Sequence, residues 1–191
     1  MGYGIIVEGP YDVSVYGELI RKICSVDVEI LPRPAAGVTN LMKHFPALLR
    51  ELEHIREAPP VEKALVIRDA GGKDPASVER LMAERLRGRT YSFPRGIQLV
   101  AVRRTMETWL LADEAAVNSV ALSRGGRPVP PIQEMPEEIV DSKERFRRWL
   151  SEAKLPYDSQ VCREIARQVK LDTLRYRCPS FRSFEQKVVD C

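Results

Sequence analysis

Three acidic residues in this 191-residue chain could converge on one site. Glu8 and Asp69 each follow a short apolar run, and Glu107 lies in the first turn after a third run. Runs of this kind are too short for helices and too apolar for exposed loops, which indicates buried parallel strands. The carboxyl ends of parallel strands share one edge of a sheet, where ligands and catalytic groups collect. We therefore expect Glu8, Asp69 and Glu107 to lie close together.

A cluster of this kind has a definite chemical preference. Carboxylates brought close together repel one another unless a cation offsets their charge. Oxygen ligands without histidine or cysteine favour Mg²⁺ or Mn²⁺, so the three acids predict a divalent-metal site. Asp113 follows Glu107 at a distance of about 9 Å along a helix. We therefore expect Asp113 to lie at most near the residues that bind the ion, and not to bind the ion itself.

Each acid also has a structural explanation. Glu8 could cap the helix that follows it, although Asp12 is better placed for that role. Asp69 precedes Ala-Gly-Gly and could form a turn, and Glu107 could be a solvated acid favoured by the helix dipole. Asp74 precedes a proline that can begin a helix, which is typical of an N-cap.

The elements that must position these acids alternate between strand and helix. This order implies parallel pairing with right-handed crossovers, hence a three-layer, Rossmann-like α/β domain with a mainly parallel central sheet. The strand at 26–31 alternates apolar and acidic residues, so we expect it nearer the sheet edge. A turn-rich loop is expected at 32–40. The expected strands span 5–7, 26–31, 64–67 and 97–102, and the expected helices span 12–23, 41–55, 75–88 and 106–111.

The remainder of the chain differs in composition. A long loop is expected at 123–131, followed by basic helices at 143–153 and 159–169 and one or two more within 171–189. This part offers few apolar anchors, so residues 119–191 are predicted to be a C-terminal helical extension packed on a core of residues 1–118. The expected anchors are Phe146, Trp149, Leu150, Ile165, Leu174 and Phe184.

The overall charge is too small to identify a nucleic-acid-binding protein. Thirty basic and 27 acidic residues give a net charge of +3. Four cations flank the expected sheet edge and could bind substrate phosphates: Arg68, Lys73, Arg103 and Arg104. The basic residues of the later helices fit solvated faces equally well, and Trp109 and Trp149 are expected in the core.

The sequence also predicts where the protein works. It has no basic leader before the first strand and no apolar window of membrane-spanning length, which favours a cytoplasmic protein without membrane contact. The four cysteines show no Cys-x-x-Cys spacing, and the two histidines lie apart from them. Neither a zinc site nor a disulfide scaffold is therefore indicated.

Several motifs resemble a known family. Val7-Glu-Gly-Pro-Tyr-Asp12, the Gly37 loop and Leu65-Val-Ile-Arg-Asp69, in this order, resemble the TOPRIM domain of topoisomerases, primases and overcoming-lysogenization-defect (OLD) nucleases. Glu107-Thr-Trp-Leu-Leu-Ala-Asp113 and Cys178-Pro-Ser-Phe181 resemble small stand-alone TOPRIM-like proteins of unassigned function, which are considered with OLD-type nucleases and mobile or defence loci. The resemblance covers nearly the whole chain.

The resemblance implies roles for individual residues. In TOPRIM enzymes a glutamate after the first strand is a general acid/base or metal ligand, and an Asp-x-Asp pair after the third binds Mg²⁺. By position, Glu8 takes the first role and Asp69 is the first aspartate of the pair, but Gly71 replaces the second. Glu107, or else Asp74 or Asp12, would then complete the coordination of Mg²⁺ or Mn²⁺.

Two functions follow from this resemblance. The first is metal-dependent phosphodiester hydrolysis of DNA or RNA, in which the ion polarises a scissile phosphate and activates water. Phage or mobile-element defence, with a partner protein from the same locus, would be its setting. The second, which Gly71 favours, is a metal- or nucleotide-binding regulatory or interaction module without turnover. The chain lacks the extra domains of a topoisomerase or primase.

Overall fold

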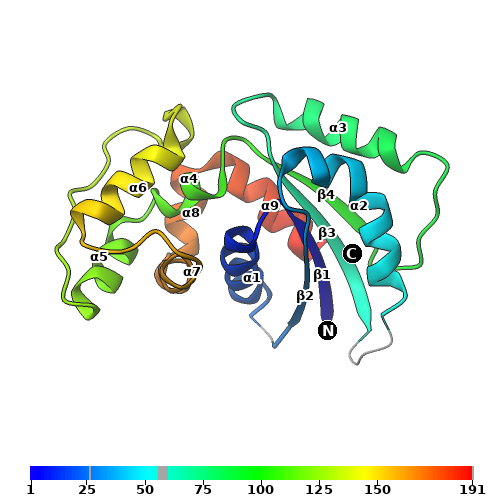
Figure 1. Ribbon diagram of the computed structural model, residues 1–191, viewed down its shortest axis with the longest axis horizontal. Coiled ribbons are helices and arrows are strands. Elements are labelled where there is room, and N and C mark those ends of the chain that lie inside the picture. Colours follow the sequence, from blue (N-terminus) through cyan, green and yellow to red (C-terminus); the bar gives the residue numbers. More distant parts are fainter. Residues whose placement is uncertain (26, 56–59, 191) are drawn as a thin grey trace.

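A parallel sheet lies at the centre of the protein (Figure 1). The computed structural model describes residues 1–25, 27–55 and 60–190, and in these the sheet has four strands in the order β2-β1-β3-β4. All three pairings are parallel, which confirms the expected α/β fold with a mainly parallel central sheet. The strands are β1 (Gly2–Val7), β2 (Glu29–Pro34), β3 (Val61–Asp69) and β4 (Ile97–Val102).

Helices cover both faces of the sheet and complete three layers. The helices α2 (Val38–Glu53) and α3 (Pro75–Leu86) pack on one face. The other face carries α1 (Pro10–Cys24) and α9 (Pro179–Val189), the last helix of the chain. Along β1 the side chains alternate between the two cores, with Ile6 under α2 and its neighbours in the larger core. Burial on both sides explains the uninterrupted apolar character of this strand.

The remaining helices form a second half beside the sheet, which we call the helical half (Figure 1). It contains α4 (Met106–Leu110), α5 (Glu114–Ser123), a short 3₁₀ turn at Pro136–Glu138, α6 (Ser142–Glu152), α7 (Ser159–Gln168) and α8 (Leu171–Arg177). The expected boundary between residues 118 and 119 falls inside α5, so the helical half begins earlier in the chain than that boundary.

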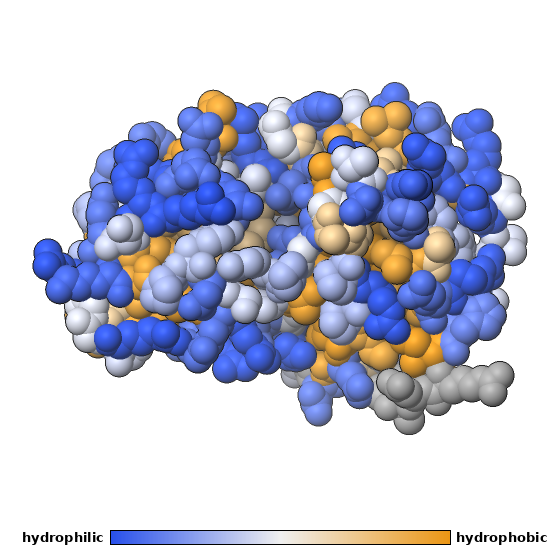
Figure 2. All heavy atoms as spheres, in the orientation of Figure 1, coloured by the Kyte–Doolittle hydropathy of each residue, from blue (hydrophilic) through white to orange (hydrophobic). Residues whose placement is uncertain are grey.

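One hydrophobic core joins the two halves. Trp109 of α4 packs against Phe181 and Phe184 of α9, with ring centroids 5.2 and 5.1 Å apart. Tyr16 of α1 lies against the same cluster. All six expected anchors of the later helices are buried, as are both tryptophans. On the outside, hydrophilic side chains cover most of the face shown in Figure 2. The helical half is therefore packed on the sheet through a shared core.

The structure corrects the position of β2. The strand was expected at 26–31 with a loop from residue 32, but it runs from Glu29 to Pro34. Val26 lies outside the described residues. The two prolines, Pro32 and Pro34, are tolerated because β2 is an edge strand that pairs only with β1. The chain then stays close to β1, because Gly37 N–H donates to the Glu8 carbonyl at 2.8 Å.

Two further expectations concern membrane-spanning segments and the state of the cysteines. No helix among the described residues is long and apolar enough to cross a membrane. Cys24, Cys162 and Cys178 are free thiols.

Candidate functional site

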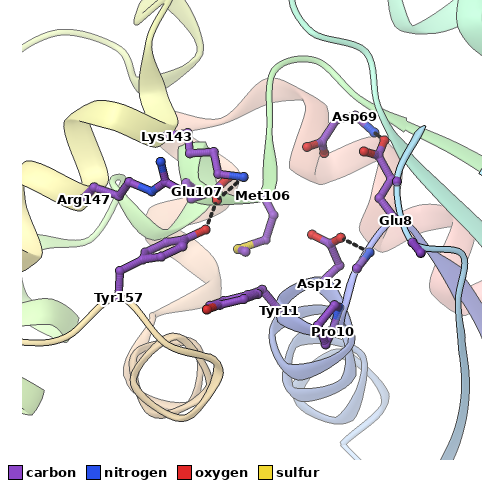
Figure 3. A pocket seen from close by; sticks show the side chains of 13 residues that line it. Glu8, Pro10, Tyr11, Asp12, Asp69, Met106, Glu107, Lys143, Arg147 and Tyr157 are labelled. Atoms are coloured by element: carbon purple, nitrogen blue, oxygen red, sulfur yellow. Dashed lines mark hydrogen bonds and ion pairs between the residues drawn. The ribbon is translucent and has the colours of Figure 1, made fainter. Parts of the chain in front are cut away.

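A cavity of about 450 Å³ opens where β1 and β3 end, between the sheet and the helical half (Figure 3). Acidic side chains from the sheet side face basic and aromatic side chains from the helical side across it. The lining side chains that matter for chemistry are Glu8, Tyr11, Asp12, Asp69, Glu107, Lys143, Arg147 and Tyr157. The three acids expected to converge, Glu8, Asp69 and Glu107, are therefore all in one cavity.

Glu8 and Asp69 are held together by the sheet itself. Glu8 follows β1 directly and Asp69 is the last residue of β3, and these two strands pair side by side. The Asp69 N–H donates to Glu8 Oε1 at 3.0 Å. The neighbouring strand ends thus place both residues in the lining of the cavity, and the hydrogen bond orients the Glu8 carboxylate.

Asp12 joins this pair while also capping α1. Its Oδ2 accepts a hydrogen bond from the backbone N–H of Gly9, the N-cap residue of α1, at 2.7 Å. Asp12 also lines the cavity with Glu8 and Asp69. The capping role anticipated for it is confirmed, and the cap places a third carboxylate beside the strand ends.

The three carboxylates on the sheet side hold protons more tightly than usual. Burial raises the pKa of Glu8 and raises that of Asp69 well above its ordinary value. Burial, with added repulsion from Glu8 and Glu107, raises the pKa of Asp12 to about 7. Arg68 and Lys143 act in the opposite direction on Glu8. A site with these properties favours protons or a cation.

Glu107 approaches from the helical side. It lies in the first turn of α4 and is only 3% exposed, so the solvated alternative is wrong. The Tyr157 hydroxyl donates to Glu107 Oε1 at 2.5 Å, and Lys143 Nζ lies 3.8 Å from the same oxygen. The negative charge of this carboxylate is therefore partly offset by its own neighbours.

The groups that face the acids are not singled out by the sequence, although Arg147 is one of the basic residues of the later helices that could contact phosphate or be solvated. Tyr157 stacks on Tyr11 with ring centroids 5.0 Å apart, and the Arg147 guanidinium lies 4.8 Å from the Tyr157 ring centre. Lys143 and Arg147 are one helical turn apart on α6, so their spacing signals a shared face. No local pattern, however, indicates that this face turns toward the ends of β1 and β3, which lie more than 70 residues earlier in the chain. Tertiary packing alone brings them there.

The four cations expected to bind phosphate lie elsewhere. None of Arg68, Lys73, Arg103 and Arg104 lines the cavity. Lys73 and Arg103 are exposed, and Arg104 Nε donates to the Glu137 carbonyl at 3.1 Å. Arg68 lies within β3, next to Asp69, but lines a neighbouring hollow and not the cavity, whereas Lys73, Arg103 and Arg104 lie beyond the ends of their strands. In the cavity their place is taken by Lys143 and Arg147.

Two other acids have structural roles outside the cavity. Asp74 Oδ2 accepts a hydrogen bond from Ser77 N–H at 3.0 Å. Asp74 is therefore the N-cap of α3, which is the structural role that the sequence also allowed for it. Asp113 is the buried N-cap of α5 and also accepts from Lys170 N–H at 2.8 Å. Asp74 therefore does not line the cavity, and a role for it as a metal ligand stays a prediction.

The carboxylates suit a hard divalent cation in chemistry but are not arranged around an ion. Among residues 1–25, 27–55 and 60–190, no three His, Cys, Asp or Glu side chains stand close enough together to hold a metal. One carboxylate oxygen of Glu8 and one of Asp12 each accept a hydrogen bond from a backbone N–H. The second oxygen of each carboxylate would be the ligand for an ion. Side-chain rotation toward a shared centre would be needed for Mg²⁺ or Mn²⁺ to bind.

Neither a curated protein nor a solved structure matches the chain. A match to a protein family covers residues 7–189, which include every residue that lines the cavity. The chain belongs to this family, which is described as a domain of unknown function (DUF4276).

Proposed function

We propose that the protein is a divalent-metal-dependent phosphodiesterase that acts on nucleic acid, a TOPRIM-type nuclease. The observation that carries this proposal is the meeting of Glu8, Asp12, Asp69 and Glu107 in one cavity, where burial and mutual repulsion raise the pKa of the first three. Oxygen-only ligand sets with excess negative charge favour Mg²⁺ or Mn²⁺. The family match is silent about activity, so the site supplies the support.

The two sides of the cavity would have different tasks. Glu8, Asp12 and Asp69 would hold the ion, which when bound supplies a polarised phosphate and an activated water. Lys143 and Arg147 would bind the non-bridging phosphate oxygens, since both line the cavity opposite these acids. Tyr157 would position Glu107 through its hydrogen bond, so that Glu107 can accept a proton from the attacking water.

The TOPRIM resemblance supports the same assignment. It gives Glu8 and Asp69 their roles by position, and these two residues are directly hydrogen-bonded. A nucleic-acid substrate would place the protein in the cytoplasm, and the free thiols of Cys24, Cys162 and Cys178 fit such a reducing compartment.

A second function rests on a specific observation. Gly71 stands where the resemblance requires the second aspartate, and the described residues contain no preformed ion-binding group. Both features fit a module that binds a metal or nucleotide without turning over substrate. This alternative keeps the cavity as a binding site and drops the hydrolytic step.

One experiment separates the two functions. Plasmid nicking is measured with Mg²⁺ or Mn²⁺ for the parent protein, Glu8→Gln, Asp69→Asn and the control Asp74→Asn. We expect nicking by the parent and the control and none by the other two, because Asp74 lies outside the cavity and asparagine still caps a helix. Absence of nicking by the parent would reject the nuclease. Calorimetric Mn²⁺ binding that depends on Glu8 and Asp69 would then support the binding module.

A further inference from the structure

Two hollows continue from the cavity along the outer side of α2. The cavity is bordered by Ala36 and Gly37, directly before this helix, and the first hollow begins at the next residues, Val38 and Thr39. The second hollow shares Lys43 with the first and extends to His54 at the end of the helix. Together they form a track that we call the α2 groove, and Figure 1 shows α2 leading away from the carboxyl ends of the strands.

The charged side chains that line the α2 groove are nearly all positive. The cations come from α2, from β3 and from α3 and the residues after it, and the one acid among the described lining residues, Glu51, lies 3.7 Å from Arg33. The cations are Lys43, Arg50, Arg68, Arg85 and Arg89. Residues from three separate elements thus bring like charges to one surface.

Most of these cations have no partner among residues 1–25, 27–55 and 60–190. Arg50 pairs with Glu53, but the side chains of Lys43, Arg68, Arg85 and Arg89 make no ion pair or hydrogen bond within the described parts of the chain. Arg68 Nε is even buried without a partner. By contrast, the arginines packed between α1 and α7 converge on Glu18. Unpaired like charges on one surface repel one another, and a polyanion would remove that repulsion.

The dimensions of the groove select an extended ligand. A helix of 16 residues is about 24 Å long, which equals about seven base-pair steps of 3.4 Å. Lys43 and Arg50 lie two turns apart, about 10 Å, so they would contact separate phosphates along the ligand. A single phosphate or nucleotide would use only one end of this surface.

We infer that the α2 groove binds the phosphodiester backbone of a nucleic acid and leads it to the acidic cavity. Arg68 marks the entrance, since it adjoins Asp69 in sequence and its charge lowers the pKa of Glu8. Backbone contacts of this kind depend on salt and not on base sequence. The inference rests on the proposed function for what happens at the end of the groove, but binding itself needs no metal and no hydrolysis.

The test measures binding apart from cleavage. Fluorescence anisotropy with labelled DNA and RNA oligonucleotides in EDTA is recorded for the parent, Lys43→Glu/Arg89→Glu and Arg127→Glu/Arg148→Glu. The control pair makes the same change in net charge at exposed cations of the helical half. We expect the groove variant to bind at least about tenfold more weakly and to lower the salt slope by about 1.5, for two lost phosphate contacts. The control pair should bind like the parent.

The outcomes distinguish this inference from the proposed function. Equal weakening by both charge-reversed pairs, or no binding by the parent, would overturn the groove. Hydrolysis of bis(p-nitrophenyl) phosphate, which is too small to use the groove, reports on the cavity alone. Groove-dependent binding without any hydrolysis would uphold the groove and reject the nuclease. Hydrolysis of the small diester without groove-dependent binding would support hydrolysis in the cavity and overturn the α2 groove.

Discussion

The backbone N–H of Asp69 donates to Glu8 Oε1 at 3.0 Å and joins two residues that are 61 positions apart in the sequence. The bond links the ends of β1 and β3, so the orientation of the Glu8 carboxylate is set by the pairing of two buried strands. A catalytic group held in this way is in place before a ligand arrives. Such preorganisation is what a metal or general acid/base site requires.

Glu8→Gln should abolish activity without disturbing the fold. The amide oxygen of glutamine can still accept from Asp69 N–H, but the side chain no longer carries the charge or the proton affinity of the carboxylate. We expect cleavage to fall by about 10²- to 10⁴-fold, with thermal unfolding at or above the parent temperature because one repelling charge is gone. Nicking rates and calorimetry check this, and a rate like that of the parent would remove Glu8 from the site.

Asp12→Asn should stabilise the protein at neutral pH. The folded-state pKa of Asp12 is about 7, above its ordinary 3.8, so the folded state binds this proton more tightly than the unfolded state. The stability of the parent therefore falls as pH rises from about 4 to 7 and then levels off. The asparagine side chain can still accept the hydrogen bond from Gly9 N–H but has no proton to lose. The free energy of unfolding of the variant should therefore exceed that of the parent by about 1–3 kcal/mol above pH 7.

Urea unfolding between pH 4 and 8, without divalent ions, measures that difference. Near pH 4 the two proteins should differ little, and the gap should widen toward pH 7. Added Mg²⁺ should narrow the gap, because an ion that binds only the folded parent stabilises it. A gap independent of pH would show that Asp12 does not titrate in this range.

Gly71→Asp should strengthen metal binding. Gly71 has a φ of +59°, and a Cβ added there would meet nothing within 4 Å. Aspartate adopts this conformation better than most residues, at a cost of about 1 kcal/mol. If the resemblance assigns the position correctly, Mn²⁺ affinity should rise relative to Gly71→Ala, which has a backbone cost but no ligand. Equal affinities of the two variants would contradict the assignment.

Tyr157→Phe should disturb Glu107 while keeping the aromatic stack. Loss of the hydroxyl leaves a buried carboxylate with Lys143 at 3.8 Å as its remaining polar contact in the cavity. We expect unfolding to become easier by about 1–3 kcal/mol and cleavage to slow. Tyr11→Phe is the matched control, because the Tyr11 ring stacks on Tyr157 without a hydroxyl contact in the described structure. Similar effects of the two substitutions would exclude a positioning role for Tyr157.

The two halves should unfold as one unit. Phe184 of α9 is fully buried against Trp109 and Tyr16, in a core that also contains side chains of β1 and β3. Phe184→Ala should therefore cost about 3–5 kcal/mol and shift a single transition seen by both tryptophan fluorescence and circular dichroism. Phe184→Leu should cost less. Two separate transitions would show that the sheet and the helical half are independent domains.

The sheet and the convergence of acids could be predicted because both follow from local patterns. Apolar runs ending in Glu8 and Asp69, each followed by a helical period, specify parallel strands whose ends meet. Asp74 beside a proline is likewise a local signal, and its capping role was anticipated. What could not be predicted is the other wall of the cavity.

That wall depends on how the later helices pack. Nothing in the sequence distinguishes Lys143, Arg147 and Tyr157 from solvated residues. Their position depends on the packing of α6 on α4 and of α7 on α1. The reverse applies to Arg68, Lys73, Arg103 and Arg104, which are close to the acids in sequence but do not line the cavity. Proximity along the chain is therefore an insufficient guide, because even consecutive strand residues such as Arg68 and Asp69 place their side chains on opposite faces of a sheet.

The contact between the first strand and the last helix has a kinetic consequence. The Tyr3 hydroxyl donates to the Val188 carbonyl at 3.0 Å across 185 residues, and Lys63 Nζ of the central strand donates to the same oxygen at 3.0 Å. Contacts this distant in sequence slow folding, because the intervening chain must be ordered first. During synthesis, the apolar face of the sheet must wait for α9 to emerge from the ribosome. We therefore expect the nascent chain to depend on chaperones until α9 has emerged from the ribosome.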